Sequence, residues 1–236
     1  MSNTADHIIK SYDTELDRLR GEIVRMGELA VAQLEAAIDV VERRDERAAK
    51  RVIDNDDAID NMENEISHGV VRLLALRAPM ASDLRAVFSS LRVASDIERI
   101  GDYAANVAKR SIPLAMVAPV APAHGLKYLA KLAADSVRKV LVAYRKNDAD
   151  SAYQVWQDDV HVDEAYNALF RELLTYMMED PRSISSCTHL LFMAKNIERI
   201  GDHATNIAES VWYTAKGEPL RTPREKGDEP TTPAGD

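Results

Sequence analysis

The first part of the chain places apolar residues at steps of three and four, the spacing of one face of an α-helix. The series comprises Leu16, Leu19, Ile23, Met26, Ala30, Leu34, Ala37, Ile38 and Val41. Candidate helix starts at Asp45 and Asp148 and several prolines divide the chain into helical segments. We therefore expect an all-α fold with helices over residues 7–44, 46–77, 82–112, 122–146, 149–179 and 183–215.

An eleven-residue phrase occurs twice in this pattern. Residues 97–107 read IERIGDYAANV and residues 197–207 read IERIGDHATNI, 100 positions further on, with eight of eleven residues identical. The acids of the preceding segment, Asp60 and Asp163, lie 103 positions apart, so the offset changes by three only near Pro79. A constant offset that shifts at a loop is what duplication leaves behind.

The duplication predicts two tandem, pseudo-symmetric three-helix bundles. We expect the first unit over residues 1–112, a linker over 113–121 that starts at Pro113, and the second unit over 122–216. Residues 217–236 contain four prolines and almost nothing apolar, so we expect a disordered tail.

Composition narrows the function without identifying it. The net charge of −9 argues against nucleic acid as the main partner, since phosphate backbones attract clusters of Lys and Arg. Cys187 is the single cysteine, which is typical of a reducing compartment, and we expect it to be a small buried residue. The N-terminus does not resemble a signal peptide and no apolar run approaches membrane-spanning length, so we expect a cytoplasmic protein.

Each copy of the repeated phrase carries two carboxylates and an amide at positions i, i+4 and i+8. These residues are Glu98, Asp102 and Asn106 in the first copy, and Glu198, Asp202 and Asn206 in the second. On a helix they stack along one side, at the border of the buried stripe. Gly101 and Gly201 lie within the same helices, where glycine is unfavourable, so we expect another helix to pass close to each.

The preceding segments add two more acid pairs, Asp56 with Asp60 and Asp159 with Asp163. If the second and third helices of each unit are antiparallel neighbours, these pairs face the phrase acids. Carboxylate oxygens are the ligands that Mg²⁺, Mn²⁺ and iron ions prefer, and zinc also accepts them. Each unit then holds a metal site of about four carboxylates, with the amides of Asn106 and Asn206 as further candidates. The alternative is a helix surface of salt bridges made by Arg99 and Arg199.

No catalytic arrangement emerges from the sequence. The residue three positions after Glu198 is Gly201, so the Glu-x-x-His pattern of di-iron bundles is missing, and no nucleophile has an evident base partner. His203 follows Asp202, but its counterpart is Tyr103, which favours a packing role. We therefore expect a protein without enzymatic activity. A carboxylate-bridged metalloenzyme and a purely structural helical interaction module are the alternatives.

The duplicated phrase, with Asp83-Leu84-Arg85 ahead of it and the acid-bearing second helices, resembles the PhoU family of bacterial phosphate-signalling regulators over residues 8–216. The resemblance implies a six-helix architecture, a homodimer, and metal ions at the acid pairs. It also implies a negative regulator of phosphate uptake and of the phosphate-starvation response. Its implied partners are PstB, the ATPase of the phosphate ABC transporter, and the sensor histidine kinase PhoR. Any association with the membrane would be peripheral and would pass through these partners.

Overall fold

The computed structural model describes residues 2–77, 82–120 and 123–220, and the side chains of residues 14–76, 83–120 and 123–220. Every regular element in the described ranges is helical, which confirms the all-α prediction. The elements are α1 (Ser2–Arg43), α2 (Glu46–Asp54), α3 (Asp56–Arg77), α4 (Ser82–Leu114), α5 (Ala123–Lys146), α6 (Ala149–Asp158), α7 (Val160–Glu179), the 3₁₀ turn η1 (Pro181–Ser183) and α8 (Ile184–Lys216).

The chain reverses at equivalent points in the two halves. Arg44 and Asn147 adopt left-handed backbone conformations, with φ of 57° and 50°. The following residues cap the next helices as expected: the Asp45 carboxylate accepts from the backbone N–H groups of residues 47 and 48, and that of Asp148 accepts from those of 150 and 151. These tight reversals return each second helix alongside the first.

The second helix of each half is interrupted, which corrects the expectation of single helices over 46–77 and 149–179. The chain leaves helical hydrogen bonding at Asn55 and at Asp159, although both keep right-handed helical dihedrals. At these points a backbone hydrogen bond joins residues three apart instead of four. The Ala58 N–H donates to the Asn55 carbonyl, and the Val162 N–H donates to the Asp159 carbonyl. The interruption therefore brings an acidic residue, Asp56 or Asp159, to the same place in each half.

The α4 helix runs through Pro113 to Leu114, so the first two residues of the expected linker are helical instead. A proline keeps helical φ and loses only one backbone hydrogen bond, which the last turn of a helix tolerates better than its centre. The Ala115 N–H still reaches the Ser111 carbonyl at 2.9 Å. At the other end of the chain, α8 stops at Gly217, which has φ of 80°. Most of the expected tail, residues 221–236, lies outside the described residues.

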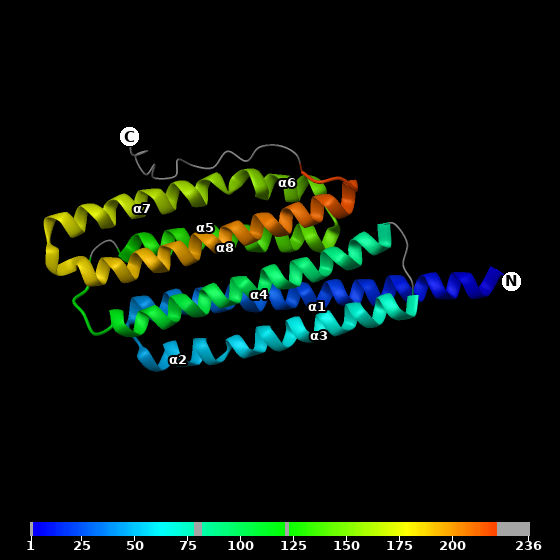
Figure 1. The fold of residues 1–236 in the computed structure, drawn as a ribbon, viewed down its shortest axis with the longest axis horizontal. Coiled ribbons are helices and arrows are strands. Elements are labelled where there is room, and N and C mark those ends of the chain that lie inside the picture. Colours follow the sequence, from blue (N-terminus) through cyan, green and yellow to red (C-terminus); the bar gives the residue numbers. More distant parts are fainter. Residues whose placement is uncertain (1, 78–81, 121–122, 221–236) are drawn as a thin grey trace, which may run out of the picture.

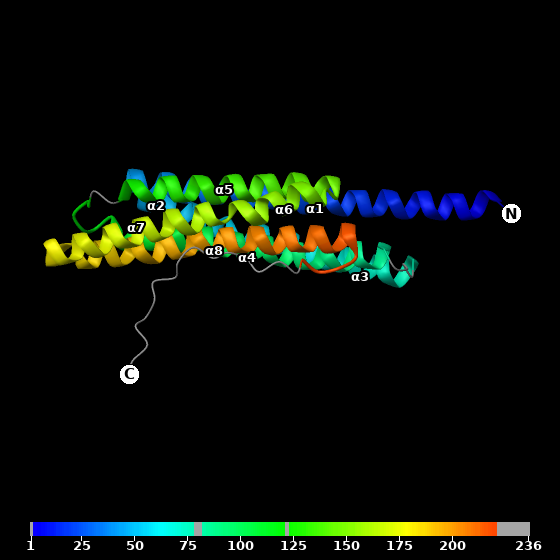
Figure 2. The same ribbon diagram turned by 90° about the horizontal axis from the view of Figure 1, so that it is seen from above.

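The two halves pack side by side and share one apolar core. Figure 1 shows α3, α4, α8 and α7 in order across the molecule, with α4 and α8 antiparallel at the centre. Figure 2, seen from above, places α1 and α5 in the layer behind α4 and α8. The repeated phrase supplies the centre of this core, because Ile97, Ile100, Ile197 and Ile200 are completely buried.

The copies of the phrase meet at an approximate twofold axis. The rings of Tyr103 and His203, which are equivalent residues, lie 5.6 Å apart between α4 and α8. His203 thus packs against its counterpart as expected, but its Nδ1 also lies 2.8 Å from Asp96 Oδ1, so it has a polar partner as well. The two acid-bearing helix pairs, α3 with α4 and α7 with α8, consequently flank the axis on either side (Figure 1).

Candidate functional site

The first half brings its two acid pairs together, as the antiparallel arrangement predicted. Asp56 and Asp60 come from α3, and Glu98 and Asp102 come from α4. The charge of Asp102 raises the pKa of each of the other three carboxyls, so all four lie within electrostatic reach. We call this group the first acidic cluster.

Burial is the main reason why these carboxyls are reluctant to ionise. Desolvation is the largest cause that raises the pKa of Asp56, Asp60 and Glu98, and the neighbouring negative charges add to it. Gln33 of α1 opposes this effect at Asp56, because its Nε2 donates to Asp56 Oδ1 at 2.8 Å. The same amide donates to the Gly101 carbonyl at 3.2 Å, so Gln33 ties the cluster to the phrase.

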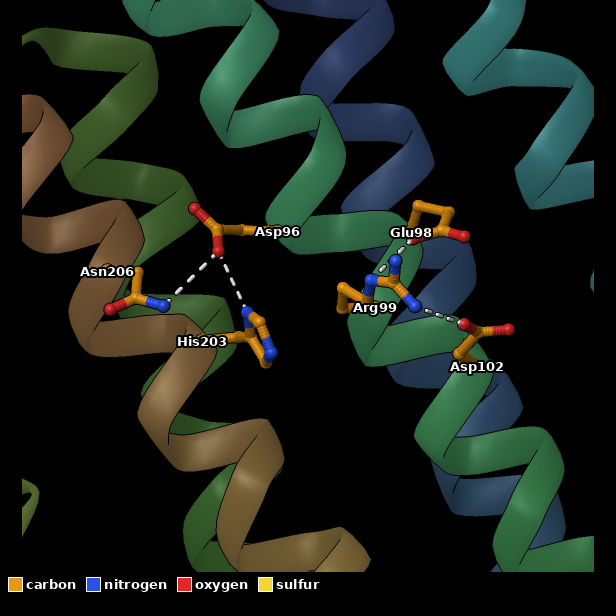
Figure 3. A network of polar contacts seen from close by, with 6 residues as sticks. All are labelled: Asp96, Glu98, Arg99, Asp102, His203 and Asn206. Atoms are coloured by element: carbon orange, nitrogen blue, oxygen red, sulfur yellow. Dashed lines mark hydrogen bonds and ion pairs between the residues drawn. The ribbon is translucent and has the colours of Figure 1, made fainter.

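Arg99 bridges two acids of the first cluster. Its Nε lies 3.5 Å from Glu98 Oε2 and its Nη1 lies 3.2 Å from Asp102 Oδ2 (Figure 3). The alternative to a metal site, a salt-bridged helix surface, is therefore present around Arg99 in these side-chain conformations. The Arg99 side chain is 56% exposed, and exposed ion pairs contribute little free energy, so its departure would cost little.

The second half builds an equivalent group from Asp159, Asp163, Glu198 and Asp202, which we call the second acidic cluster. Glu198 is 12% exposed, and its Oε1 accepts from Lys195 Nζ at 2.7 Å. Its Oε2 is buried and has no hydrogen-bond partner among the described residues. Burial raises the pKa of Glu198, the charges of Asp202 and Asp163 raise it further, and the bond from Lys195 opposes them.

Two glycines allow these clusters to form. A Cβ on Gly101 would lie 2.8 Å from Ile59 Cδ1, and one on Gly201 would lie 3.0 Å from Asp159 Oδ1. The close helix approach expected from the glycines is therefore confirmed. It also allows Asp159, at 1% exposure, to lie directly against α8 at Gly201.

The amides of the repeated phrase, Asn106 and Asn206, lie away from the carboxylates of the two acidic clusters. Asn206 Nδ2 donates to Asp96 Oδ1 at 3.3 Å, and His203 Nδ1 lies 2.8 Å from the same oxygen. Figure 3 shows this trio between α4 and α8, whereas Glu98 and Asp102 lie on the side of α4 farther from α8. Asn106 lines a separate pocket between the same helices. The i+8 position drifts around the helix towards the axis, which separates the amides from the carboxylates.

Sequence reasoning missed the role of Asp96. Its carboxylate joins the two halves through His203 and Asn206, across 107 and 110 residues of sequence. The sequence signal for this contact was a difference between equivalent positions of the two repeats: Asp96 corresponds to Asn196, and Tyr103 corresponds to His203. Charge differences between repeats mark positions where the copies have acquired different contacts.

The donor chemistry of both clusters fits hard metal ions. Each offers four carboxylates, and the buried, unpartnered Glu198 Oε2 is an acceptor that an ion would satisfy. In the present rotamers, no three His, Cys, Asp or Glu side chains of the described residues converge closely enough to hold an ion. A metal ion would therefore be held only after side chains rotate; at present Glu98 and Asp102 pair with Arg99, and Glu198 pairs with Lys195.

The single cysteine and the apolar character of the helices also bear on what the sequence predicted. Cys187 is completely buried, as expected for a packing residue. None of the helices in the described ranges combines the length and apolar character needed to cross a bilayer.

Comparison with known proteins gives a consistent result. The model of the PhoU domain matches residues 23–111 and again residues 126–211. The chain is 60% identical over 222 residues to the "Phosphate-specific transport system accessory protein PhoU homolog" of Xylella fastidiosa (strain 9a5c), covering 94% of each chain. It is 46% identical over 224 residues to the protein of the same description from Caulobacter vibrioides (strain NA1000 / CB15N), covering 94% of this chain and 97% of that one.

Two solved structures share the fold. PhoU from Pseudomonas aeruginosa superposes with a TM-score of 0.83 at 39% identity, covering 88% of this chain and all of that one. The phosphate transport system regulatory protein PhoU from Streptococcus pneumoniae superposes with a TM-score of 0.82 at 31% identity, covering 89% of this chain and all of that one.

Proposed function

Because the chain belongs to the PhoU family, we propose that it is a non-enzymatic accessory protein that regulates a phosphate-specific transport system, and that its acidic clusters bind metal ions. The descriptions of its relatives support the regulatory part. The duplicated acidic clusters carry the metal part, because each half gathers four carboxylates at equivalent places, most of them partly buried, where their charges disfavour one another.

Four residues of each half would hold the cation. These are Asp56, Asp60, Glu98 and Asp102 in the first half, and Asp159, Asp163, Glu198 and Asp202 in the second. A bound Mg²⁺, Mn²⁺, Zn²⁺ or iron ion supplies positive charge to oxygens that otherwise repel each other. The carboxylates at the start of α3 and at the α6–α7 junction would then be fastened to those of α4 and α8, which would make each helix pair a more rigid surface for a partner.

We further propose that the protein works in the cytoplasm as a homodimeric adaptor between the transporter ATPase PstB and the sensor kinase PhoR, and so represses phosphate uptake and the starvation response when phosphate is plentiful. The family resemblance supports this assignment of partners. The outer helices α3 and α7 support it physically, since they carry exposed apolar side chains including Val71, Leu76 and Met178.

Co-precipitation from cells grown in high and low phosphate tests the proposal. We expect the tagged full-length chain to retain the ATPase and the kinase at high phosphate, and a deletion strain to express a starvation-controlled phosphatase constitutively. A double variant, Glu198→Gln with Asp202→Asn, should weaken retention. The matched variant Glu164→Gln with Glu172→Gln, which removes two exposed charges from α7, should not. Absence of both partners from the wild-type precipitate, together with a normally repressed phosphatase in the deletion strain, would rule out the adaptor role.

A further inference from the structure

A polar pocket of about 350 Å³ lies between α4 and α8, outside both acidic clusters. Its lining residues are Asn106, Lys109, Arg110, Pro113, His189 and Asn196. None of these described residues is acidic, although the chain as a whole carries a net charge of −9. The pocket is therefore a local concentration of hydrogen-bond donors and positive charge on an acidic protein.

The cationic groups of the pocket have no direct ion-pair partner among the described residues, although the charge of Lys109 also reaches Asp56 and Asp60 of the first acidic cluster, where it opposes the rise in their pKa that burial causes. The guanidinium carbon of Arg110 lies 4.1 Å from the ring centroid of Phe192, a geometry that fixes the guanidinium plane. Among the described residues, neither Lys109 nor Arg110 makes a hydrogen bond or an ion pair. The Nδ1 atom of His189 is buried and likewise lacks a partner within the described part of the chain. These groups have unused capacity to bind an acceptor.

The twofold relation provides an internal comparison. The positions equivalent to Asn196, Lys109 and Arg110 are occupied by Asp96, Glu209 and Ser210. There the polar groups are satisfied by the protein itself: Asp96 binds His203 and Asn206, and Glu209 accepts from Trp156 Nε1 at 3.2 Å. One end of the α4–α8 contact thus has two carboxylates that accept hydrogen bonds from the protein, whereas the two cations at the other end make no hydrogen bond or ion pair with a described residue.

We propose that the pocket between α4 and α8 binds a phosphate group. A tetrahedral oxyanion offers several acceptor oxygens, and the pocket presents the ammonium of Lys109, the planar fork of Arg110 and the amides of Asn106 and Asn196 around one space. His189 Nδ1 completes the set from α8. The proposal rests on these side chains alone and does not require metal at the acidic clusters.

Calorimetric titration of the full-length chain with inorganic phosphate, in the presence of a chelator, tests the proposal. Parallel titrations with a simple phosphate monoester and with sulfate distinguish free phosphate from an esterified phosphate group and from a general anion. The variant Lys109→Gln with Arg110→Gln removes both cations from the pocket. The control Lys127→Gln with Lys131→Gln removes the same charge from exposed positions of α5.

We expect saturable binding of phosphate or its monoester by the wild type and the control, and a loss of affinity of about tenfold or more in the pocket variant. Retained helicity in circular dichroism shows that this variant is folded. The proposal is overturned if the wild type binds neither phosphate compound saturably, if sulfate binds as tightly as both, or if the two double variants lose affinity equally. Because metal is removed throughout, the outcome is independent of the metal proposal.

Discussion

Glu198 is a side chain whose ionised form opposes folding, and it belongs to the second acidic cluster, where we propose that a metal ion binds. Burial and the charges of Asp202 and Asp163 raise its pKa, so ionisation costs free energy in the folded chain. The contribution of protonated Glu198 to the free energy of unfolding is fully present below the ordinary carboxyl pKa. It is lost as the pH rises through the raised pKa of the folded chain. Above that range the ionised Glu198 destabilises the metal-free protein.

The substitution Glu198→Gln should therefore stabilise the metal-free protein at pH 7 and above, by about 0.5 kcal/mol if it relieves one like-charge neighbour. The advantage should shrink towards pH 4, where the wild-type carboxyl is protonated. Thermal unfolding in chelator and in excess Mn²⁺ measures the effect. Glu172→Gln, an exposed change on α7, should leave the midpoint unchanged in both conditions. In Mn²⁺ the order of wild type and Glu198→Gln should reverse, and a constant order would count against a role in cation binding.

The glycines of the phrase make a second prediction about individual residues. Alanine favours a helix over glycine by about 1 kcal/mol, but at Gly101 its Cβ would overlap the completely buried Ile59. Overpacking of this kind costs about 1–3 kcal/mol, so Gly101→Ala should be destabilising by about 1 kcal/mol in urea unfolding. Gly69 of α3 is the control: a Cβ there would have no neighbour closer than Leu19 Cδ1 at 4.0 Å. Gly69→Ala should stabilise, and equal stabilisation by both alanines would disprove the close approach.

Among the elements, the reversals between the first and second helices are the most constrained. Arg44 has φ of 57°, a conformation that costs a non-glycine residue about 1–2 kcal/mol. It also donates from Nη2 to the carbonyls of Leu114 and Val117, which ties the first reversal to the end of α4. The strain is thus accompanied by contacts that hold the connection between the two halves.

Replacing Arg44 separates these two effects. Arg44→Ala and Arg44→Gly both remove the guanidinium, but only glycine relaxes the backbone. The glycine variant should be more stable than the alanine variant by about 1 kcal/mol in denaturant unfolding, while both should be less stable than the wild type. Asn147, with φ of 50°, should show the same order between its alanine and glycine variants. Equal stabilities of the two Arg44 variants would show that the left-handed conformation is not strained.

The helices were largely predictable because their signals are local. Periodic apolar residues and the caps Asp45 and Asp148 specify where chain segments are helical, and the offset between repeats places them in two units. The breaks at Asn55 and Asp159 were not predictable, since both residues keep helical dihedrals and differ only in hydrogen-bond span. Pro113 was misleading because proline in the last turn costs little.

The acidic clusters followed from the repeat, but the rest of the site did not. Facing acid pairs could be inferred because duplicated spacing and antiparallel helices leave few alternatives. Asn106 and Asn206 lie apart from the cluster carboxylates because position i+8 on an α-helix has rotated by about 80° from position i. The contacts of Asp96 and the pocket around Arg110 depend on pairing between halves, which a single sequence specifies only through differences between its repeats.

At the scale of the molecule, duplication has produced two similar acidic clusters and two dissimilar ends of the α4–α8 contact. The helix pairs that carry the clusters, α3 with α4 and α7 with α8, lie on opposite sides of the α4–α8 contact (Figure 1), and one continuous core supports both. A change in one cluster should therefore leave the other intact. This independence makes the number of bound ions a direct readout of the proposed sites.

The most direct test counts metal ions in the full-length chain by equilibrium dialysis against Mn²⁺ and Fe²⁺, followed by elemental analysis. We predict saturable binding that falls by about half when Glu98→Gln and Asp102→Asn remove the first cluster, falls equally when Glu198→Gln and Asp202→Asn remove the second, and disappears when all four are changed. The control Glu164→Gln with Glu172→Gln should bind as the wild type does. A wild-type chain that binds neither ion, or a four-residue variant that binds as much as the wild type, would contradict the account.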